Sequence, residues 1–200
     1  MADPREIDRV KAKYNIDDDY LLYLGTLQPR KNLSRLITAF AQVQSSFQPP
    51  TPNFQLVLAG KTGWYADPLF QQVAERSLSA RVLFPGYIAE TDKAVLLSGA
   101  TAFVYPSLYE GFGFPILEAM RCGVPVLCSH TSSLPEVAGD AALLIDPLNV
   151  ESIADGLPRI ISDQTLRQKL IDAGYIQAKI FSWQTCANVV LKVIEQVLNS

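Results

Sequence analysis

The segment 102–126 constrains the fold more than any other part of the chain, because it predicts a strand, a glycine-rich loop, a helix and a second strand in direct succession. Residues 102–105 are an apolar run of the length typical of a buried strand. The loop has a Gly-Phe-Gly tip at residues 111–113. Pro115 suits the first turn of a helix, and Gly123 suits the position just past its end. This order of elements is one βαβ unit, in which the two strands run parallel.

The same alternation of short apolar runs and helical segments continues on both sides of this unit. We therefore predict an α/β fold: a single Rossmann-like domain with a parallel sheet flanked by helices. Strands are expected at residues 20–24, 54–59, 81–84, 102–105, 124–127 and 141–145. The domain would span residues 20–200, with C-terminal helices from residue 150, after a lead-in helix or linker over residues 1–19.

Two polar residues are expected to cap helices. Asn32 precedes one helical segment, and Ser182 precedes the last one. In that last segment Val190, Ile194 and Val197 form an apolar stripe at helical spacing. The proline-rich residues 48–53 are predicted to be a linker.

Composition narrows the class of protein. With 48% hydrophobic residues and mixed charge, the 200-residue chain is expected to be globular with its own core. A net charge of −3 without a basic block gives nucleic-acid binding no electrostatic support. No apolar run approaches the ~20 residues of a membrane span, and the three cysteines lack the spacing of a zinc site. We therefore expect a cytoplasmic protein that needs no metal.

Charged residues follow two of the predicted strands. Glu110 comes after the strand at 102–105, and Arg30 and Lys31 come after the strand at 20–24. The carboxyl ends of parallel strands share one edge of a sheet, where ligands bind. Because a helix N-terminus also favours anions, cations placed beside one predict a diphosphate site. Glu118, about one turn into the next helix, could face the same crevice, and the combination suits a phosphorylated sugar.

Glu110 and Glu118 are separated by seven residues, and the segment E-G-F-G-F-P-I-L-E-A-M-R-C-G-V-P-V resembles the E-x7-E signature of retaining glycosyltransferases. The resemblance is to glycosyltransferase family 4, the group 1 glycosyltransferases, and extends over about residues 23–146. These enzymes have the GT-B fold, which contains two Rossmann-like domains. The resemblance therefore implies that this chain is the C-terminal, nucleotide-sugar-binding half of such a fold.

The resemblance also implies roles for the matching residues. In the string Y-L-G-T-L-Q-P-R-K-N, Arg30 and Lys31 would hold the phosphates of a nucleotide leaving group. Glu110 would contact hydroxyls of the transferred sugar, so these three residues are the predicted catalytic set. Glu118 would accept hydrogen bonds from the ribose hydroxyls. The other residues expected to bind the donor are Gly25, Gly60, Lys61, Tyr87, Ile88, Gly111, Phe112, Gly113, Phe114 and Leu117.

Simpler explanations exist for some of these residues. Lys61 could be an ordinary surface lysine, and the rings of Phe112 and Phe114 could belong to the core. An acid in the first turns of a helix, such as Glu118, is common and stabilises the helix by about 0.3–1 kcal/mol.

On this resemblance we expect the donor-binding domain of a retaining hexosyltransferase in polysaccharide or glycan biosynthesis. UDP-glucose is the favoured donor, and the acceptor would be a saccharide or a lipid-linked saccharide. No cofactor is expected, because Arg30 and Lys31 would take the place of a metal. The chain alone would transfer sugar poorly or not at all, since the N-terminal GT-B domain would be missing. A longer protein could lie at the inner face of the membrane.

Three alternatives remain open. The first is a GDP-mannose-dependent mannosyltransferase domain. The second is a non-catalytic nucleotide-sugar-binding module, which would tolerate the loss of Glu110. The third is a glycoside hydrolase, which also uses paired carboxylates but does not need cations beside a helix N-terminus.

Overall fold

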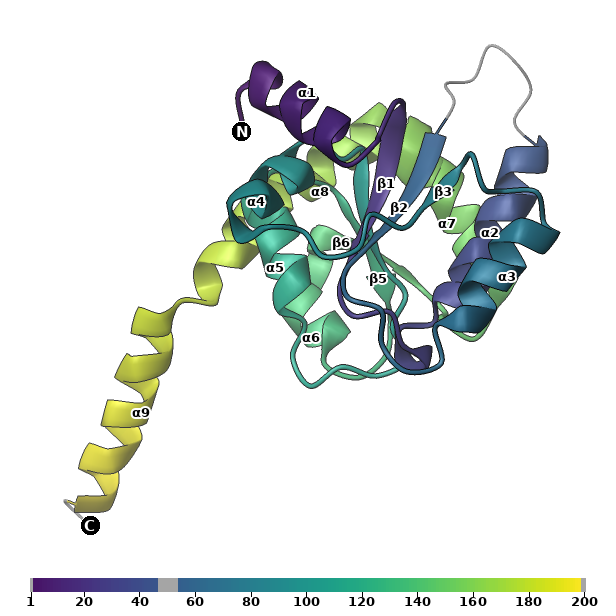
Figure 1. Cartoon of the computed structure of the whole chain (residues 1–200). Coiled ribbons are helices and arrows are strands. Elements are labelled where there is room, and N and C mark those ends of the chain that lie inside the picture. Colours follow the sequence, from purple (N-terminus) through teal and green to yellow (C-terminus); the bar gives the residue numbers. More distant parts are fainter. Residues whose placement is uncertain (1, 47–53, 199–200) are drawn as a thin grey trace.

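Six short apolar runs pair into one sheet with the strand order β3-β2-β1-β4-β5-β6, and all neighbouring strands are parallel (Figure 1). The computed structural model describes residues 2–46 and 54–198, so the linker predicted at 48–53 lies outside the described residues. β2, β4 and β5 are buried along their whole length, as expected for runs without polar alternation. The strands are β1 (Asp19–Leu24), β2 (Phe54–Ala59), β3 (Val82–Leu83), β4 (Ala102–Tyr105), β5 (Val126–Ser129) and β6 (Ala142–Ile145).

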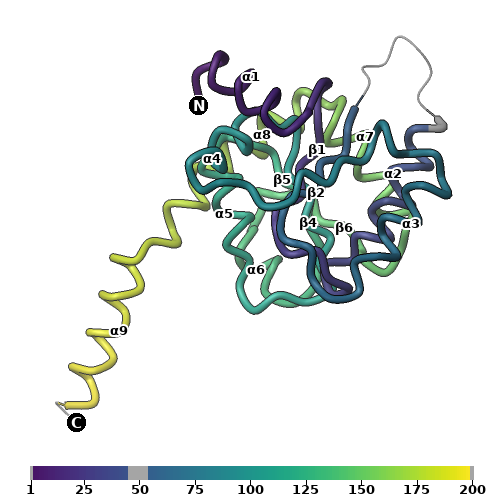
Figure 2. The backbone as a smooth tube through the Cα atoms, viewed as in Figure 1, coloured from purple at the N-terminus to yellow at the C-terminus, as the bar shows by residue number. Residues whose placement is uncertain are grey.

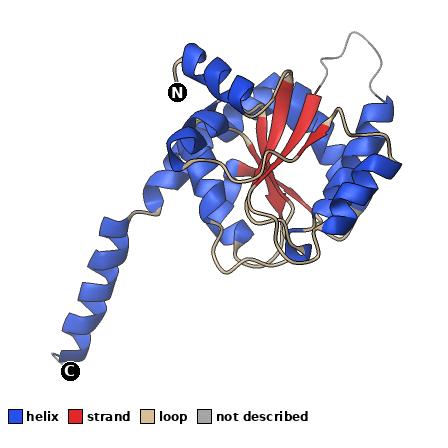
Figure 3. Ribbon diagram, in the orientation of Figure 1, coloured by secondary structure: helices blue, strands red, loops and turns tan. Residues whose placement is uncertain are grey.

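Helices cover both faces of this sheet (Figure 3). On one side α2, α3 and α7 pack together, and on the other α5 packs against α4, α6 and α8. The fold class predicted from the alternating pattern is therefore confirmed. The helices are α1 (Pro4–Lys13), α2 (Leu33–Ser46), α3 (Asp67–Glu75), α4 (Glu90–Ser98), α5 (Phe114–Arg121), α6 (Leu134–Ala138), α7 (Val150–Ser162), α8 (Gln164–Ile180) and α9 (Trp183–Leu198), with 3-10 turns η1 (Pro29–Lys31) and η2 (Gly139–Ala141).

The start of β5 differs from the prediction. We expected a strand from residue 124, but β5 begins at Val126. Gly123 turns the chain after α5 with a φ of 73°, and Pro125 has no N–H to donate to a neighbouring strand. Pro125 contributes its carbonyl oxygen instead, which accepts a hydrogen bond of 2.9 Å from the amide of Phe103.

Asn32 also differs from the prediction. Its Nδ2 donates to the carbonyl oxygens of Pro106 at 3.1 Å and Pro147 at 2.6 Å. Its Oδ1 accepts from the guanidinium of Arg35 at 2.9 Å. Among the described residues these bonds replace the helix cap that we expected, and they tie together the loops that follow β1, β4 and β6. The cap predicted for α9 is confirmed, because the amide of Thr185 donates to Ser182 Oγ at 3.0 Å.

The strand order changes direction between β1 and β4. β1 lies at the centre of the sheet, and β2 and β4 pair with its two sides. The chain therefore runs outward from β1 to β3, returns to β4 and continues outward on the other side. In open parallel sheets a ligand binds at the carboxyl ends of the strands where the order changes direction, here β1 and β4.

The N-terminal helix α1 is attached to α4 through one buried acid. Asp92 on α4 is 2% exposed and accepts hydrogen bonds from Arg9, Lys13 and Tyr14 at 3.2, 2.5 and 2.9 Å. Residues of α1 and of the turn after it thus neutralise a carboxylate that α4 alone could not bury without cost.

The last helix, α9, extends away from the rest of the molecule (Figure 2). None of its described residues is buried, although its sequence is largely apolar. Large side chains that a packed helix would cover are open to solvent, including Trp183 at 82% and Leu191 at 56%. A groove of about 840 Å³ lies between the first half of α9 and α5, along which its lining extends from Phe114 to Arg121.

Candidate functional site

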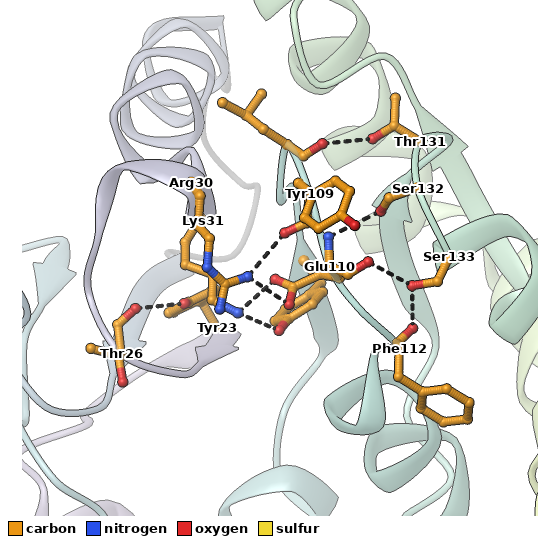
Figure 4. Close-up of polar contacts among 12 residues, drawn as sticks. Tyr23, Thr26, Arg30, Lys31, Tyr109, Glu110, Phe112, Thr131, Ser132 and Ser133 are labelled. Carbon is orange, nitrogen blue, oxygen red and sulfur yellow. Dashed lines mark hydrogen bonds and ion pairs between the residues drawn. The ribbon is translucent and has the colours of Figure 1, made fainter.

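Three charged side chains predicted to act together meet where the strand order changes direction (Figure 4). Arg30 and Lys31 lie in η1 after β1, and Glu110 lies in the loop after β4. Arg30 Nη1 contacts Glu110 Oε2 at 2.8 Å, and Lys31 Nζ contacts Glu110 Oε1 at 2.6 Å. Each carboxylate oxygen of Glu110 thus contacts a different cation. Arg30 also donates to the carbonyl oxygen of Tyr109 at 2.9 Å.

Burial makes this cluster electrostatically sensitive. Lys31 is 5% exposed and Glu110 is 8% exposed, whereas the side chain of Arg30 is 45% exposed. Burial lowers the pKa of Lys31, although the hydrogen bond to Glu110 opposes that shift. Burial also disfavours the charged form of Glu110, but hydrogen bonds from Lys31 and Arg30 outweigh it and hold the pKa of Glu110 below its usual value. The ion pair therefore favours the carboxylate of Glu110, and it opposes the effect of burial on the ammonium group of Lys31.

Tyr105, the last residue of β4, is a member of the cluster that sequence reasoning missed. Its hydroxyl accepts a hydrogen bond of 2.7 Å from Lys31 Nζ, which also lies 4.9 Å from the centre of the ring. The ring stacks on Tyr23 with 5.9 Å between centroids. In the sequence Tyr105 is indistinguishable from an apolar strand residue, because only the pairing of β1 with β4 brings it to Lys31.

Two serines hold the main chain of the Glu110 loop and were also missed (Figure 4). The amide of Glu110 donates to Ser132 Oγ at 3.1 Å. The hydroxyl of Ser133 lies 3.0 Å from the carbonyl oxygen of Glu110 and 2.7 Å from that of Phe112. The polar run at residues 131–133, directly after β5, is the only sequence signal that could have pointed to them.

The glycine tip leads into the N-terminus of α5. Gly113 precedes the helix with a φ of 116°, and a Cβ at this position would lie 2.8 Å from Leu134 Cδ2. Within the described residues, the amides of Gly111, Phe112 and Gly113 donate no hydrogen bond. Free amides at a helix N-terminus attract anions. Gly111 is exposed, so a ligand can approach this tip from solvent.

Glu118 lies apart from the three-residue cluster. Its Oε1 accepts from Lys93 Nζ, on α4, at 2.6 Å. Lys93 was not among the residues singled out from the sequence. Glu118 lines the groove beside α9 together with Phe112, Phe114 and Leu117, all of which were predicted to contact the donor.

The remaining predicted residues lie in the loops after β1, β2 and β3. Lys61 is exposed, and its Nζ lies 5.5 Å above the ring of Tyr87. Ile88 is 5% exposed, so its side chain belongs to the core and only its main chain is available to a ligand. Gly25 and Gly60 end β1 and β2, and a Cβ on Gly60 would overlap the carbonyl oxygen of Gly25. Glycine thus permits the close contact of these two loops.

The predicted residues therefore form three neighbouring groups along one edge of the sheet. One group is the cluster of Arg30, Lys31 and Glu110, which presents cations and a carboxylate. A second is the glycine tip with the groove up to Glu118, which presents amides, phenyl rings and an acid. The third is the pair formed by Lys61 and Tyr87. Cations and amides suit phosphate oxygens, and carboxylates suit vicinal hydroxyls.

Among residues 2–46 and 54–198, no group of three or more His, Cys, Asp or Glu side chains is placed to hold a metal ion. In the same part of the chain, no helix has both the length and the apolar character required to cross a membrane.

Comparison with known proteins identifies the family. Residues 4–177 match the family model described as "Glycosyl transferases group 1". The chain belongs to this family. The chain is 42% identical over 184 residues to O-antigen chain mannosyltransferase B of Escherichia coli. The match covers 92% of this chain and 48% of that relative. The chain is 33% identical over 174 residues to the MMP alpha-(1->4)-mannosyltransferase of Mycolicibacterium hassiacum, covering 85% of the chain and 41% of the relative.

Solved structures agree with this assignment. Sucrose-phosphate synthase from Thermosynechococcus elongatus superposes with a TM-score of 0.80 and 29% identity over 96% of this chain and 49% of that one. A glycosyltransferase from Rickettsia africae has a TM-score of 0.86 at 16% identity, over 98% of this chain and 53% of that one, which supports the fold alone. The expected family and GT-B type of fold are confirmed. This group 1 glycosyltransferase chain spans about half or less of the length of each of these relatives.

Proposed function

We propose that this chain is the donor-binding half of a glycosyltransferase that uses a nucleoside-diphosphate hexose. One observation carries the proposal: Arg30, Lys31 and Glu110 converge at the point where the strand order changes direction, beside the free amides before α5. A diphosphate would bind the cations and amides, and Glu110 would turn to the hydroxyls of the sugar. Glu118 would hold the ribose.

For the donor we favour GDP-mannose over UDP-glucose, which revises the order of preference drawn from the sequence. The support is that two relatives, at 42% and 33% identity, are both named mannosyltransferases. The base would contact the main chain near Ile88, whose side chain is buried. Main-chain contacts of this kind leave no signature in the sequence, so the base has to be determined by experiment.

The proposed reaction breaks the bond between the anomeric carbon and the diphosphate oxygen. The acceptor oxygen forms the new bond to that carbon on the same face of the sugar, and its proton passes to the departing diphosphate. Negative charge grows on the leaving diphosphate. Lys31 and Arg30 already lie together before the ligand arrives, so they would stabilise that charge with little movement of the cations themselves. The chain supplies these charges from its own side chains, and we propose that the transfer needs no metal.

Binding measurements test the donor. Isothermal titration of the chain with GDP, UDP and ADP is expected to give binding with GDP and weaker or no binding with UDP and ADP. Binding of UDP with no binding of GDP would restore UDP-glucose as the donor. If none of the three binds, the chain is not a donor-binding domain.

A second experiment separates an enzyme from a non-catalytic module. In the full-length protein, Glu110→Gln is expected to lower transfer by at least about 100-fold while GDP binding persists, because the carboxylate would contact the sugar and not the base. Glu75→Gln is the matched control, since Glu75 is an exposed acid at the end of α3. GDP binding without transfer by the unaltered protein or by either variant would favour the non-catalytic module, and equal transfer by both variants would show that Glu110 is not catalytic. Hydrolysis of a chromogenic glycoside without nucleotide would favour the hydrolase.

A further inference from the structure

We propose that Tyr105 is a positioning residue for Lys31: its hydroxyl fixes the ammonium group so that one N–H remains directed at a phosphate oxygen of the donor. This inference rests on the proposed function. It concerns a residue in the interior of the sheet, which contacts Lys31 and not the ligand.

The first step of the argument is the hydrogen bonding of the ammonium group. A lysine ammonium has three N–H donors. In the described part of the chain, one reaches Glu110 at 2.6 Å and a second reaches the hydroxyl of Tyr105 at 2.7 Å. The third is left for a ligand. Because Lys31 is 5% exposed, little water is available to replace a lost acceptor.

The second step is the rigidity of the hydroxyl. Tyr105 is 2% exposed, and its ring is stacked between Tyr23, at 5.9 Å, and Phe103, at 5.7 Å. Burial raises the pKa of Tyr105 above the ordinary value of a tyrosine, which favours the neutral hydroxyl. The side chain therefore offers Lys31 an acceptor of fixed position and constant protonation.

The third step is that Glu110 cannot fill this role alone. Its two oxygens are divided between Lys31 and Arg30. In the proposed function the same carboxylate contacts the hydroxyls of the donor, so its bond to Lys31 weakens when the ligand arrives. Tyr105 has no such second task, and it keeps Lys31 in place throughout the reaction.

The surroundings of Lys31 also determine its charge. Glu110 faces it from the loop after β4, Arg30 from η1, and Tyr105 from β4, with Tyr23 of β1 behind Tyr105. Glu110 favours the ammonium form, whereas burial and the charge of Arg30 disfavour it. Loss of the Tyr105 acceptor would disfavour the ammonium form further, so Lys31 would lose its proton at a lower pH.

The test uses two variants that each remove one buried hydroxyl. Tyr105→Phe removes the acceptor of Lys31, and Tyr20→Phe removes a hydroxyl that donates to the carbonyl oxygen of Leu96 at 2.6 Å, on the side of α4. GDP binding is measured by isothermal titration from pH 6.5 to 10 in the chain, and kcat and KM are measured in the full-length protein. For Tyr105→Phe we expect about tenfold weaker GDP binding at pH 7.5, the scale of one hydrogen bond to a charged group. Its alkaline loss of binding should begin at a lower pH, whereas Tyr20→Phe should keep the original affinity and pH profile.

The outcomes are distinguishable. If the unaltered chain binds none of GDP, UDP and ADP, the proposed function fails and this inference fails with it. If GDP binds the unaltered chain and Tyr105→Phe with the same affinity and pH profile, only this inference is overturned. Should Tyr105→Phe not fold, the ammonium signal of Lys31 is measured by ¹⁵N NMR in the unaltered chain and assigned by its loss in Lys31→Arg. A signal protected from solvent exchange supports a fixed ammonium group, and a rapidly exchanging one overturns it.

Discussion

At the scale of single residues, the buried pair of Lys31 and Glu110 dominates the energetics of the site. Two charges with exposures of 5% and 8% are tolerated because each satisfies the other at 2.6 Å. Removing one partner of such a pair leaves a buried charge without compensation, which costs more than removing both. Arg30 reduces that cost for Glu110, since it is a second cation on the same carboxylate.

A double-mutant cycle tests this coupling. Lys31→Met is expected to lower the free energy of unfolding by about 2–3 kcal/mol, less than for an isolated buried pair because Arg30 remains. Adding Glu110→Leu should restore a large part of that loss, since no buried charge is then left over. Urea denaturation measures the free energy of unfolding of the two single variants and of the double variant. A double variant whose loss equals the sum of the two single losses would show that the pair is not coupled.

Two glycines in the same loop are expected to respond differently to substitution. Gly113 has a φ of 116° and its added Cβ would crowd Leu134, whereas a Cβ on Gly111 would meet no atom within 4 Å. Gly113→Ala should therefore lower the free energy of unfolding by about 1–3 kcal/mol, and Gly111→Ala should change it little. Equal effects in urea denaturation would contradict the assigned backbone conformation.

These residues also show the limit of what the sequence predicts at this scale. The E-x7-E spacing pointed to Glu110 and Glu118, and the R-K pair after β1 pointed to the cations. Their partners could not be read from the sequence, because Lys31 and Tyr105 are 74 positions apart and meet only when β1 pairs with β4. Lys93 next to Glu118 is a similar case.

At the scale of elements, the attachment of α1 to α4 depends on the ionisation of Asp92. Hydrogen bonds from Lys13 and Tyr14 hold the pKa of Asp92 below its ordinary value. A carboxyl whose folded-state pKa is lowered stabilises the fold above its unfolded pKa, about 3.9, and that stabilisation disappears as the pH falls through the folded value. The α1–α4 contact should therefore weaken in acid.

The variant Asp92→Asn tests this attachment. At pH 7 it should unfold at a lower urea concentration than the unaltered chain, because Arg9 and Lys13 lose their counter-charge. Its stability should also fall less steeply between pH 5 and pH 3 than that of the unaltered chain, on the scale of a carboxyl titration. Asp8→Asn, which changes an exposed acid on α1, is the control. Identical acid dependence in both variants would exclude Asp92 as the titrating group.

At the scale of the whole molecule, the alternation of short apolar strands and helices was enough to predict a parallel α/β sheet. The βαβ unit at 102–126 predicted that β4 and β5 run parallel. The glycine and proline residues at the boundaries of its elements predicted where those elements end, to within two residues. The strand order was not predictable from the pattern, because it depends on which strands pair across long connections. The amphipathic pattern of the last segment predicted a helix, but the pattern alone does not predict that α9 lies away from the sheet.

The exposed apolar surface of α9 should make the chain self-associate when it is studied alone. Val190 and Ile194 are 51% and 48% exposed. In the proposed function this surface would contact the half of the protein that the chain lacks. Val190→Glu with Ile194→Glu should lower self-association in analytical ultracentrifugation, because both charges would have to be buried in the contact. Asn188→Glu with Gln196→Glu adds the same charge to polar positions of α9, and an equal decrease there would mean that charge alone is responsible.

The division of Glu110 between two cations has a consequence for selectivity. With one carboxylate between Arg30 and Lys31, the three ionised side chains together carry a single surplus positive charge, and each cation has an anionic partner. Chloride or inorganic phosphate could displace Glu110 from the cations only by leaving its carboxylate buried without a hydrogen-bond donor. In the proposed function, a molecule that bears hydroxyl groups next to its phosphates would give the displaced acid new hydrogen-bond donors, so we expect it to bind more tightly than a simple anion.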